Sequence, residues 1–161
     1  KLSERRYRSG DLDGMFLVIG ATDDEELNRQ ISNDADHLNT LCNIADRPEV
    51  CNFILPSIVQ RDDLVITIST SGRSPAMAKK LRKTLESQFG EEYGVFLKLM
   101  GAARKKLLSQ AHQPEAHKHL FEQLIAADLI GMIQKGKTAE IDALLLEILG
   151  EGYNFRELMR S

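Results

Sequence analysis

The segment MFLVIGATDDEELNRQISNDADHLNTLCNIAD (Met15–Asp46) decides the fold. It opens with a nearly continuous apolar run, Met15–Ala21, and closes with a second one, Leu41–Ala45. Short apolar runs of this kind are typical of strands that are buried on both faces of a parallel sheet. The segment therefore predicts two parallel strands and a connection that crosses between them.

The connection, Thr22–Asn39, predicts a helix. Acidic residues crowd its start, where they stabilise a helix N-terminus. The buried face of this helix is expected to carry Leu27, Ile31, Ala35 and Leu38. Strand, helix and strand then form a βαβ unit with a right-handed crossover. Because the chain begins at Lys1 rather than at Met and reaches a strand early, we expect a front portion of this domain to precede it.

The stretch NFILPSIVQRDDLVITIST (Asn52–Thr70) is typical of two strands joined by a polar turn, here at Gln60–Asp63. Pro56 falls inside the first of these strands and indicates an edge or a bulge. A helix is expected to begin at Pro75, with Ser74 as its N-cap.

From residue 91 onward the chain is predicted to be helical, because apolar residues recur at helical spacing. The helices are expected to break near His112–Pro114, at Gly136 and at Gly150. The expected core positions near the end of the chain are Leu144, Leu145, Ile148 and Leu149.

The composition excludes several classes of protein. The 161 residues are 42% hydrophobic and 28% charged, which is a globular balance without the signature of disorder. The net charge is −3 and the basic residues are dispersed, so we expect no nucleic-acid partner. The absence of an apolar run of 18 residues predicts no membrane partner. Two cysteines make no disulfide framework, which favours a cytoplasmic location.

The cysteines and histidines give little support for a metal site. Cys42 and Cys51 are nine residues apart and have no CxxC partner, whereas zinc takes about four ligands. We interpret both as structural thiols. In HQPEAHKH, His112, His117 and His119 are five and two residues apart, which is not the i,i+4 spacing of a helical metal pair. No protein metal site is therefore predicted.

Asp46 directly follows the second predicted strand, Leu41–Ala45. Ligands of open α/β sheets bind beyond the carboxyl ends of the strands, so a carboxylate there can act as a base or bind a metal or a pyrrole N–H. An aspartate before Arg-Pro suits the start of a turn equally well. The residues alone leave both interpretations open.

A second candidate site is STSGRSP (Ser69–Pro75), which joins a predicted strand to a helix. Hydroxyls, backbone N–H groups and Arg73 come together there, as in an anion site at a helix N-terminus. Capping of the helix by Ser74 is expected in either case. No G-x-G-x-x-G follows a predicted strand, so this sequence contains no dinucleotide loop.

Together these motifs resemble the precorrin-2 dehydrogenase / sirohydrochlorin ferrochelatase family, which is also the front module of siroheme synthase. The family pattern runs A-T-D-D…N, then N-V-V-D-x-P…F-I-x-P-S-I-V, then I-S-T-x-G-x-S-P, and is matched in order over Val18–Leu85. The resemblance implies an α/β fold with a partial Rossmann-like parallel sheet, a strand-pair dimerisation region and a helical C-terminal domain. The expected bounds are 1–48 for the back half of the NAD-binding domain, 49–90 and 91–161.

The resemblance implies NAD-dependent oxidation of precorrin-2 to sirohydrochlorin by a homodimer, with ferrous iron as a possible further substrate. It places catalysis at Asp46 and cofactor contacts at Thr22 and Asn43. The implied substrate-binding residues are Ser69, Thr70, Arg73 and Ser74, with Lys79 and Lys80 close by. The chain departs from the family pattern in lacking the Gly-rich loop, in Gly20 for the first Ala of A-A-T-D-D, and in Ser71 for the first Gly of S-T-G-G-x-S-P.

Two other functions fit the same residues. Without the dinucleotide loop, the chain suits a non-catalytic module that dimerises through Asn52–Ser69 or binds a tetrapyrrole. It also suits a chelatase that uses Asp46 to insert iron or cobalt and needs no NAD.

Overall fold

The computed structural model describes residues 2–110 and 114–160. The chain forms two compact units, one made of residues up to 57 with 68–80 and the other of 58–67 with residues from 81 onward. The domain bounds expected at 48 and 90 stay predictions. The described residues contain no helix that is long and apolar enough to cross a membrane.

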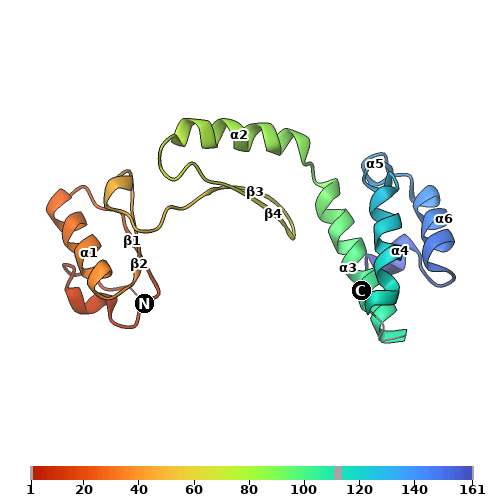
Figure 1. Cartoon of the computed structure of the whole chain (residues 1–161), viewed down its shortest axis with the longest axis horizontal. Coiled ribbons are helices and arrows are strands. Elements are labelled where there is room, and N and C mark those ends of the chain that lie inside the picture. Colours follow the sequence, from red (N-terminus) through yellow and green to blue (C-terminus); the bar gives the residue numbers. More distant parts are fainter. Residues whose placement is uncertain (1, 111–113, 161) are drawn as a thin grey trace. The chain divides into compact units, whose positions relative to one another are not determined.

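The first unit contains the predicted βαβ arrangement (Figure 1). Its elements are η1 (Ser9–Leu12), β1 (Leu17–Gly20), α1 (Glu25–His37), β2 (Leu41–Ile44) and the short 3-10 helix η2 (Pro48–Val50). β1 and β2 are parallel and in register from Leu17 opposite Leu41 to Gly20 opposite Ile44. The sequence prediction of two parallel strands joined by a helix is confirmed.

Helix α1 packs on one face of this strand pair. Its N-cap is Asp24, whose carboxylate accepts a hydrogen bond from the N–H of Leu27. The core of the unit consists of Leu12, Ile31, Ala35, Cys42 and Ile44. The prediction that Leu38 is buried is wrong: Leu38 is the C-cap of α1 and its side chain is 47% exposed. The helix reaches its end there, so the 3.6-residue period no longer fixes which way the residue points.

Two strands form a hairpin that a two-residue turn closes. They are β3 (Ser57–Arg61) and β4 (Leu64–Ile68). β3 begins only after Pro56, so the prediction that Pro56 lies inside the strand is wrong. Proline lacks an N–H for strand pairing, which explains why pairing starts at the next residue. The turn is also shorter than the predicted Gln60–Asp63.

Helix α2 (Pro75–Gln88) begins as predicted, with the Ser74 hydroxyl accepting a hydrogen bond from the N–H of Met77 at 3.3 Å. Its C-terminal end is held by the hairpin. The Arg61 guanidinium donates hydrogen bonds to the carbonyls of Phe89 at 2.8 Å and Glu86 at 3.1 Å. These contacts satisfy carbonyls that the end of a helix leaves without intrahelical donors.

The second unit is otherwise helical (Figure 1). Its helices are α3 (Glu92–Gln110), α4 (Pro114–Ala126), α5 (Leu129–Gln134), α6 (Thr138–Leu149) and α7 (Phe155–Leu158). The breaks at Gly136 and Gly150 are confirmed, and both glycines have positive φ, 65° and 88°. The interruption between α4 and α5 was not predicted. His112 lies outside the described residues.

The second unit has its own hydrophobic core. It consists of Phe96, Leu99, Ala103, Leu107, Leu124, Leu129, Ile141, Leu145, Tyr153 and Leu158. The predicted core positions Leu144, Ile148 and Leu149 pack against it and are partly buried. The chain therefore has a separate apolar core in each unit.

Substitutions of two adjacent leucines of α6 test the assignment of this core. Leu145 is 1% exposed and Leu146 is 54% exposed. Leu145→Ala should lower the free energy of unfolding by about 2–4 kcal/mol, because it leaves a cavity in a closely packed core. Leu146→Ala should change it by less than about 0.5 kcal/mol. Urea unfolding followed by circular dichroism measures both, and equal losses in the two variants would contradict this assignment of the core.

Candidate functional site

The carboxyl ends of β1 and β2 meet at one edge of the sheet. Parallel pairing continues one step beyond the strands, where the N–H of Ala45 donates a hydrogen bond to the carbonyl of Gly20 at 2.8 Å. The residues that follow the two strands, Thr22 and Asp46, are thus delivered to the same edge. This is the edge at which open α/β sheets bind ligands.

Asp46 occupies a tight turn that ends β2. The N–H of Arg47 donates a hydrogen bond to the carbonyl of Ile44 at 3.3 Å, and Asp46 has a φ of 59°. Aspartate tolerates this left-handed conformation better than most residues. Its side chain is exposed and makes no hydrogen bond or ion pair with any described residue. The turn and the ligand interpretations of Asp46 are therefore compatible, because the turn leaves the carboxylate available.

Arg47 ties this turn to the start of α1. Its guanidinium contacts the carboxylate of Glu25 at 2.8 Å and that of Glu49 at 2.6 Å. Hydrogen bonds from the guanidinium, together with its positive charge, lower the pKa of both carboxyls. Sequence reasoning missed this network; the only signal was a lone arginine after the strand and an excess of acids at the start of the helix.

The chain then runs back along the free edge of β2. The N–H of Cys42 donates to Asn52 Oδ1 at 2.6 Å, and the N–H of Phe53 donates to the carbonyl of Cys42 at 3.0 Å. Cys51 Sγ accepts a hydrogen bond from the N–H of Ile44 at 3.1 Å. These contacts supply the partners that an edge strand lacks, and they give Cys51 a structural role.

The two implied cofactor contacts are also held by internal hydrogen bonds. The Thr22 hydroxyl donates to Asn28 Oδ1 at 3.0 Å and accepts from the N–H of Asp24 at 3.1 Å. The Asn43 amide donates to the carbonyl of Phe53 at 2.9 Å. Lone pairs on the Thr22 hydroxyl and the Asn43 carbonyl remain for a ligand.

The corner Ser69–Pro75 is a turn with two left-handed residues. Ser71 and Gly72 have φ values of 52° and 75°, and the N–H of Arg73 donates to the carbonyl of Thr70 at 3.0 Å. Consecutive positive φ angles are characteristic of a turn that favours Gly-Gly. Ser71 therefore stands where the family pattern has glycine and where the backbone disfavours a side chain.

The corner Ser69–Pro75 is in close contact with the residues that follow Asp46. A Cβ added at Gly72 would lie 3.0 Å from Cβ of Pro48, the first residue of η2. Both segments belong to the first unit. The two candidate sites that the sequence indicated are thus adjacent. Asp46 is two residues before Pro48, and Arg73 is one residue after Gly72.

Most donors of the corner are used internally. Ser69 Oγ accepts from the N–H of Ser71, and Thr70 Oγ1 accepts from the N–H of Ser74. The predicted capping by Ser74 is confirmed. The guanidinium of Arg73 is exposed and has no partner among the described residues. An anion at this corner would accordingly depend on Arg73 more than on a cradle of backbone N–H groups.

The edge fits part of a nicotinamide dinucleotide. Hydroxyl, amide and carboxylate groups suit ribose hydroxyls and a carboxamide. A pyrophosphate does not fit the start of α1, because the four acids Asp23–Glu26 would repel it. In the residues that the structure describes, no Gly-rich turn follows β1 or β2.

The structure groups no three metal-ligating side chains among residues 2–110 and 114–160. Cys42 is fully buried in β2, and burial raises the pKa of its thiol. His117 and His119 lie in α4, which belongs to the second unit, whereas the edge of β1 and β2 belongs to the first unit.

Comparison with known proteins gives matches to both units. Residues 1–57 match the family described as "Putative NAD(P)-binding", and residues 61–88 match "Sirohaem biosynthesis protein central". Siroheme synthase of Pseudomonas paraeruginosa is 33% identical over 152 residues, which cover 94% of this chain and 33% of that protein. Siroheme synthase 1 of Pectobacterium atrosepticum is 34% identical over 138 residues, covering 86% of this chain and 29% of that protein. The chain spans about a third of the length of these curated relatives.

A solved structure has the same fold. SirC, a precorrin-2 dehydrogenase, superimposes with a TM-score of 0.56 at 22% identity, over 83% of this chain and 70% of SirC. The α/β fold class expected from the sequence, with a short parallel sheet, a strand pair and a helical region, is confirmed.

The corner offers a matched pair of substitutions. Ser71→Gly should raise the free energy of unfolding by about 0.5–1 kcal/mol, because it relieves a left-handed serine. Gly72→Ala should lower it by at least about 1 kcal/mol, since the new Cβ is both in the left-handed region and against Pro48. Urea unfolding of the two variants checks the turn, and destabilisation by Ser71→Gly would contradict it.

Proposed function

Because the chain belongs to the siroheme synthase and precorrin-2 dehydrogenase family, we propose that it takes part in the NAD-dependent oxidation of precorrin-2 to sirohydrochlorin. The observation that carries the proposal is the adjacency of two segments in the first unit. The turn of Asp46 and the corner Ser69–Pro75 are joined by the contact of Pro48 with Gly72. The carboxylate of Asp46 and the guanidinium of Arg73, neither of which has a partner among the described residues, thereby lie on neighbouring segments.

The reaction removes two hydrogens from precorrin-2, one as a hydride and one as a proton. A bound nicotinamide supplies the hydride acceptor. Asp46 takes up the proton as a general base, a role that suits an accessible carboxylate at the carboxyl end of a strand. Its left-handed turn, with the ion pairs of Arg47 on one side and β2 on the other, fixes the backbone of Asp46 at this edge.

The substrate is a polycarboxylate, so its recognition requires cations. Arg73 is the exposed cation of the corner, and Lys79 lies on the next turn of α2. Arginine binds carboxylates through two parallel N–H groups, which also fixes orientation. Ser69, Thr70 and Ser74 act chiefly by holding the corner in shape, because their hydroxyl oxygens accept hydrogen bonds from backbone N–H groups. Their O–H groups then donate hydrogen bonds to carboxylates of the substrate.

Thr22 and Asn43 would hold the nicotinamide nucleotide through their remaining acceptors. The preference for NAD over NADP in this proposal is supported by the resemblance of the motifs to an NAD-dependent family. A cytoplasmic location, which the two thiols favour, belongs to the same proposal.

Insertion of ferrous iron into sirohydrochlorin is the second candidate function. The observation in its favour is again the carboxylate of Asp46, which no described residue engages and which suits removal of pyrrole protons as the metal enters the ring. An assay of iron or cobalt insertion with NAD omitted separates this activity from the oxidation. A chain that binds sirohydrochlorin but performs neither reaction would instead be a binding module.

We also propose that the hairpin β3–β4 dimerises with a second copy. A single two-stranded hairpin is marginally stable in water. Ile58 and Val65 are 48% and 52% exposed on it, which leaves apolar surface for a shared intersubunit sheet.

Asp46→Asn tests the catalytic role. Asparagine has nearly the same size and tolerates the same left-handed conformation, so the turn should persist. In the full-length protein we expect kcat/KM for precorrin-2 to fall at least about a hundredfold, with sirohydrochlorin affinity changed by less than about threefold. Asp63→Asn, in the turn of the hairpin, is the matched control. Normal turnover by Asp46→Asn would refute the assignment.

Charged substitutions on the β3–β4 hairpin test the proposed dimerisation. Ile58→Lys combined with Val65→Lys should shift the mass measured by light scattering from dimer to monomer, because it buries like charges in the shared sheet. Leu146→Lys, which adds charge to an exposed leucine of α6, should leave the mass unchanged. A monomeric wild-type protein would contradict the proposal at once.

A further inference from the structure

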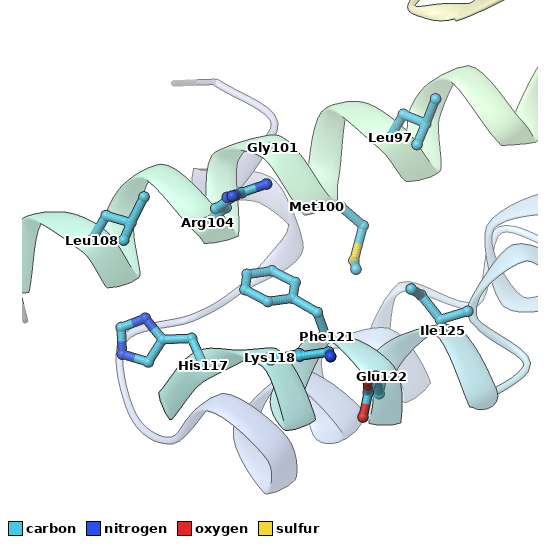
Figure 2. A pocket seen from close by; sticks show the side chains of 10 residues that line it. All are labelled: Leu97, Met100, Gly101, Arg104, Leu108, His117, Lys118, Phe121, Glu122 and Ile125. Carbon is cyan, nitrogen blue, oxygen red and sulfur yellow. The ribbon is translucent and has the colours of Figure 1, made fainter. Parts of the chain in front are cut away.

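The helical part of the second unit contains a pocket that the proposed oxidation does not use. It lies between α3 and α4 (Figure 2) and has a volume of about 600 Å³. Sites for small organic ligands typically measure about 300–1,000 Å³. The pocket belongs wholly to residues of one compact unit.

The lining of the pocket is mainly apolar. Leu97, Met100 and Leu108 contribute from α3, and Phe121 and Ile125 contribute from α4. Figure 2 shows Met100 and Phe121 directed into the space between the two helices. Ile125 is 64% exposed, so the chain leaves apolar surface uncovered here.

Gly101 is the residue of α3 that lines the pocket without a side chain. A Cβ built at this position meets no heavy atom within 4 Å. A larger residue would fit the helix and would fill the pocket, so glycine is what keeps this part of the space open.

Two cations face the pocket from opposite helices. Arg104 of α3 and Lys118 of α4 both line it, and neither pairs with a carboxylate in the described part of the chain. Glu122 is the acidic residue of the lining. The lining therefore carries a net positive charge beside an apolar surface, which is complementary to an apolar anion.

His117 adds a polar group that lacks a partner. Its Nδ1 is shielded from solvent and has no hydrogen-bond partner among residues 2–110 and 114–160. A shielded nitrogen without a partner costs free energy, and a ligand oxygen or a carboxylate can relieve that cost.

We propose that the α3–α4 pocket binds an apolar monocarboxylate of the fatty-acid type. The hydrocarbon chain packs on Met100 and Phe121, and the carboxylate is held by Arg104 and Lys118. A tetrapyrrole does not suit this lining, because its carboxylates surround the macrocycle and most of them would meet apolar side chains. The proposal is therefore independent of the oxidation, and its failure would leave the proposed function unaffected.

The test uses the full-length protein and the fluorescent acid 11-(dansylamino)undecanoate. We expect a saturable rise in fluorescence that dodecanoate reverses by competition. The methyl ester of the probe, which has no charge, should bind roughly tenfold more weakly. Absence of saturable binding, or equal binding of acid and ester, would overturn the proposal.

Substitutions then locate the site. Arg104→Gln and Lys118→Gln should each weaken binding of the acid by roughly three- to tenfold and leave the ester unaffected. Lys105→Gln is the matched control, because Lys105 is adjacent on α3 and does not line this pocket. An equal effect of all three substitutions would contradict a specific carboxylate site.

Gly101→Leu should abolish binding by filling the space, while Gly101→Ala should preserve most of it. Leucine is a better helix former than glycine, and a Cβ at this position meets no heavy atom within 4 Å, so the variant should fold. Retained binding in Gly101→Leu would overturn the proposal. A change of oligomeric state in Gly101→Leu, measured by light scattering, would also overturn it, since a second copy would then cover the pocket.

Discussion

The in-register parallel pairing of β1 with β2 is the constraint on which the first unit depends. Because Gly20 lies opposite Ile44, both strands end at the same level and both connections leave from one edge. Gly20 also packs against Ile44, since a Cβ at Gly20 would lie 2.5 Å from Cδ1 of Ile44. A shift of one residue would turn the buried side chains of β2 to the other face. The position of Asp46 therefore follows from the sheet and not from its own turn alone.

Four non-glycine residues of the described chain have positive φ, and two of them, Asp46 and Ser71, lie where function is proposed. Asp46 and Ser71 both adopt left-handed backbone conformations that residues other than glycine rarely occupy. Asp46 is two residues before Pro48 and Ser71 is one residue before Gly72, and Pro48 and Gly72 are in close contact. Such conformations persist only where surrounding contacts enforce them, and they occur often at ligand sites. Here the enforcing contacts are the hydrogen bonds of the corner and the ion pairs of Arg47.

The elements that the sequence predicted well are those with a local signal. Apolar runs gave β1 and β2, and the sequence Ser74-Pro75 gave the start of α2. Prediction failed where partners are distant in the chain. The ion pair of Arg47 with Glu25 spans 22 residues, and the hydrogen bond of Asn52 to Cys42 spans 10. No periodicity reveals such pairs, so the role of Arg47 and the pairing of residues 51–53 with β2 could not be foreseen.

The same limit applies to the α3–α4 pocket. Its apolar residues follow the helical spacing that also predicts a core, as at Leu97, Met100 and Leu108. Sequence alone cannot distinguish a helix face that packs against another helix from one that borders a space. Gly101 is the distinguishing residue, because its missing side chain matters only once the opposite helix is placed.

The distribution of charge in the first unit limits which of its groups can bind an anion. Arg47 already forms ion pairs with Glu25 and Glu49, so it could bind an anion only if both ion pairs broke. The start of α1, which is ordinarily a site for anions, carries four acids and is closed to them. Arg73 is the exposed cation of the corner that no described residue engages. A carboxylate that approaches this edge is thus directed by repulsion from α1 and attraction to Arg73, which favours the corner over the helix.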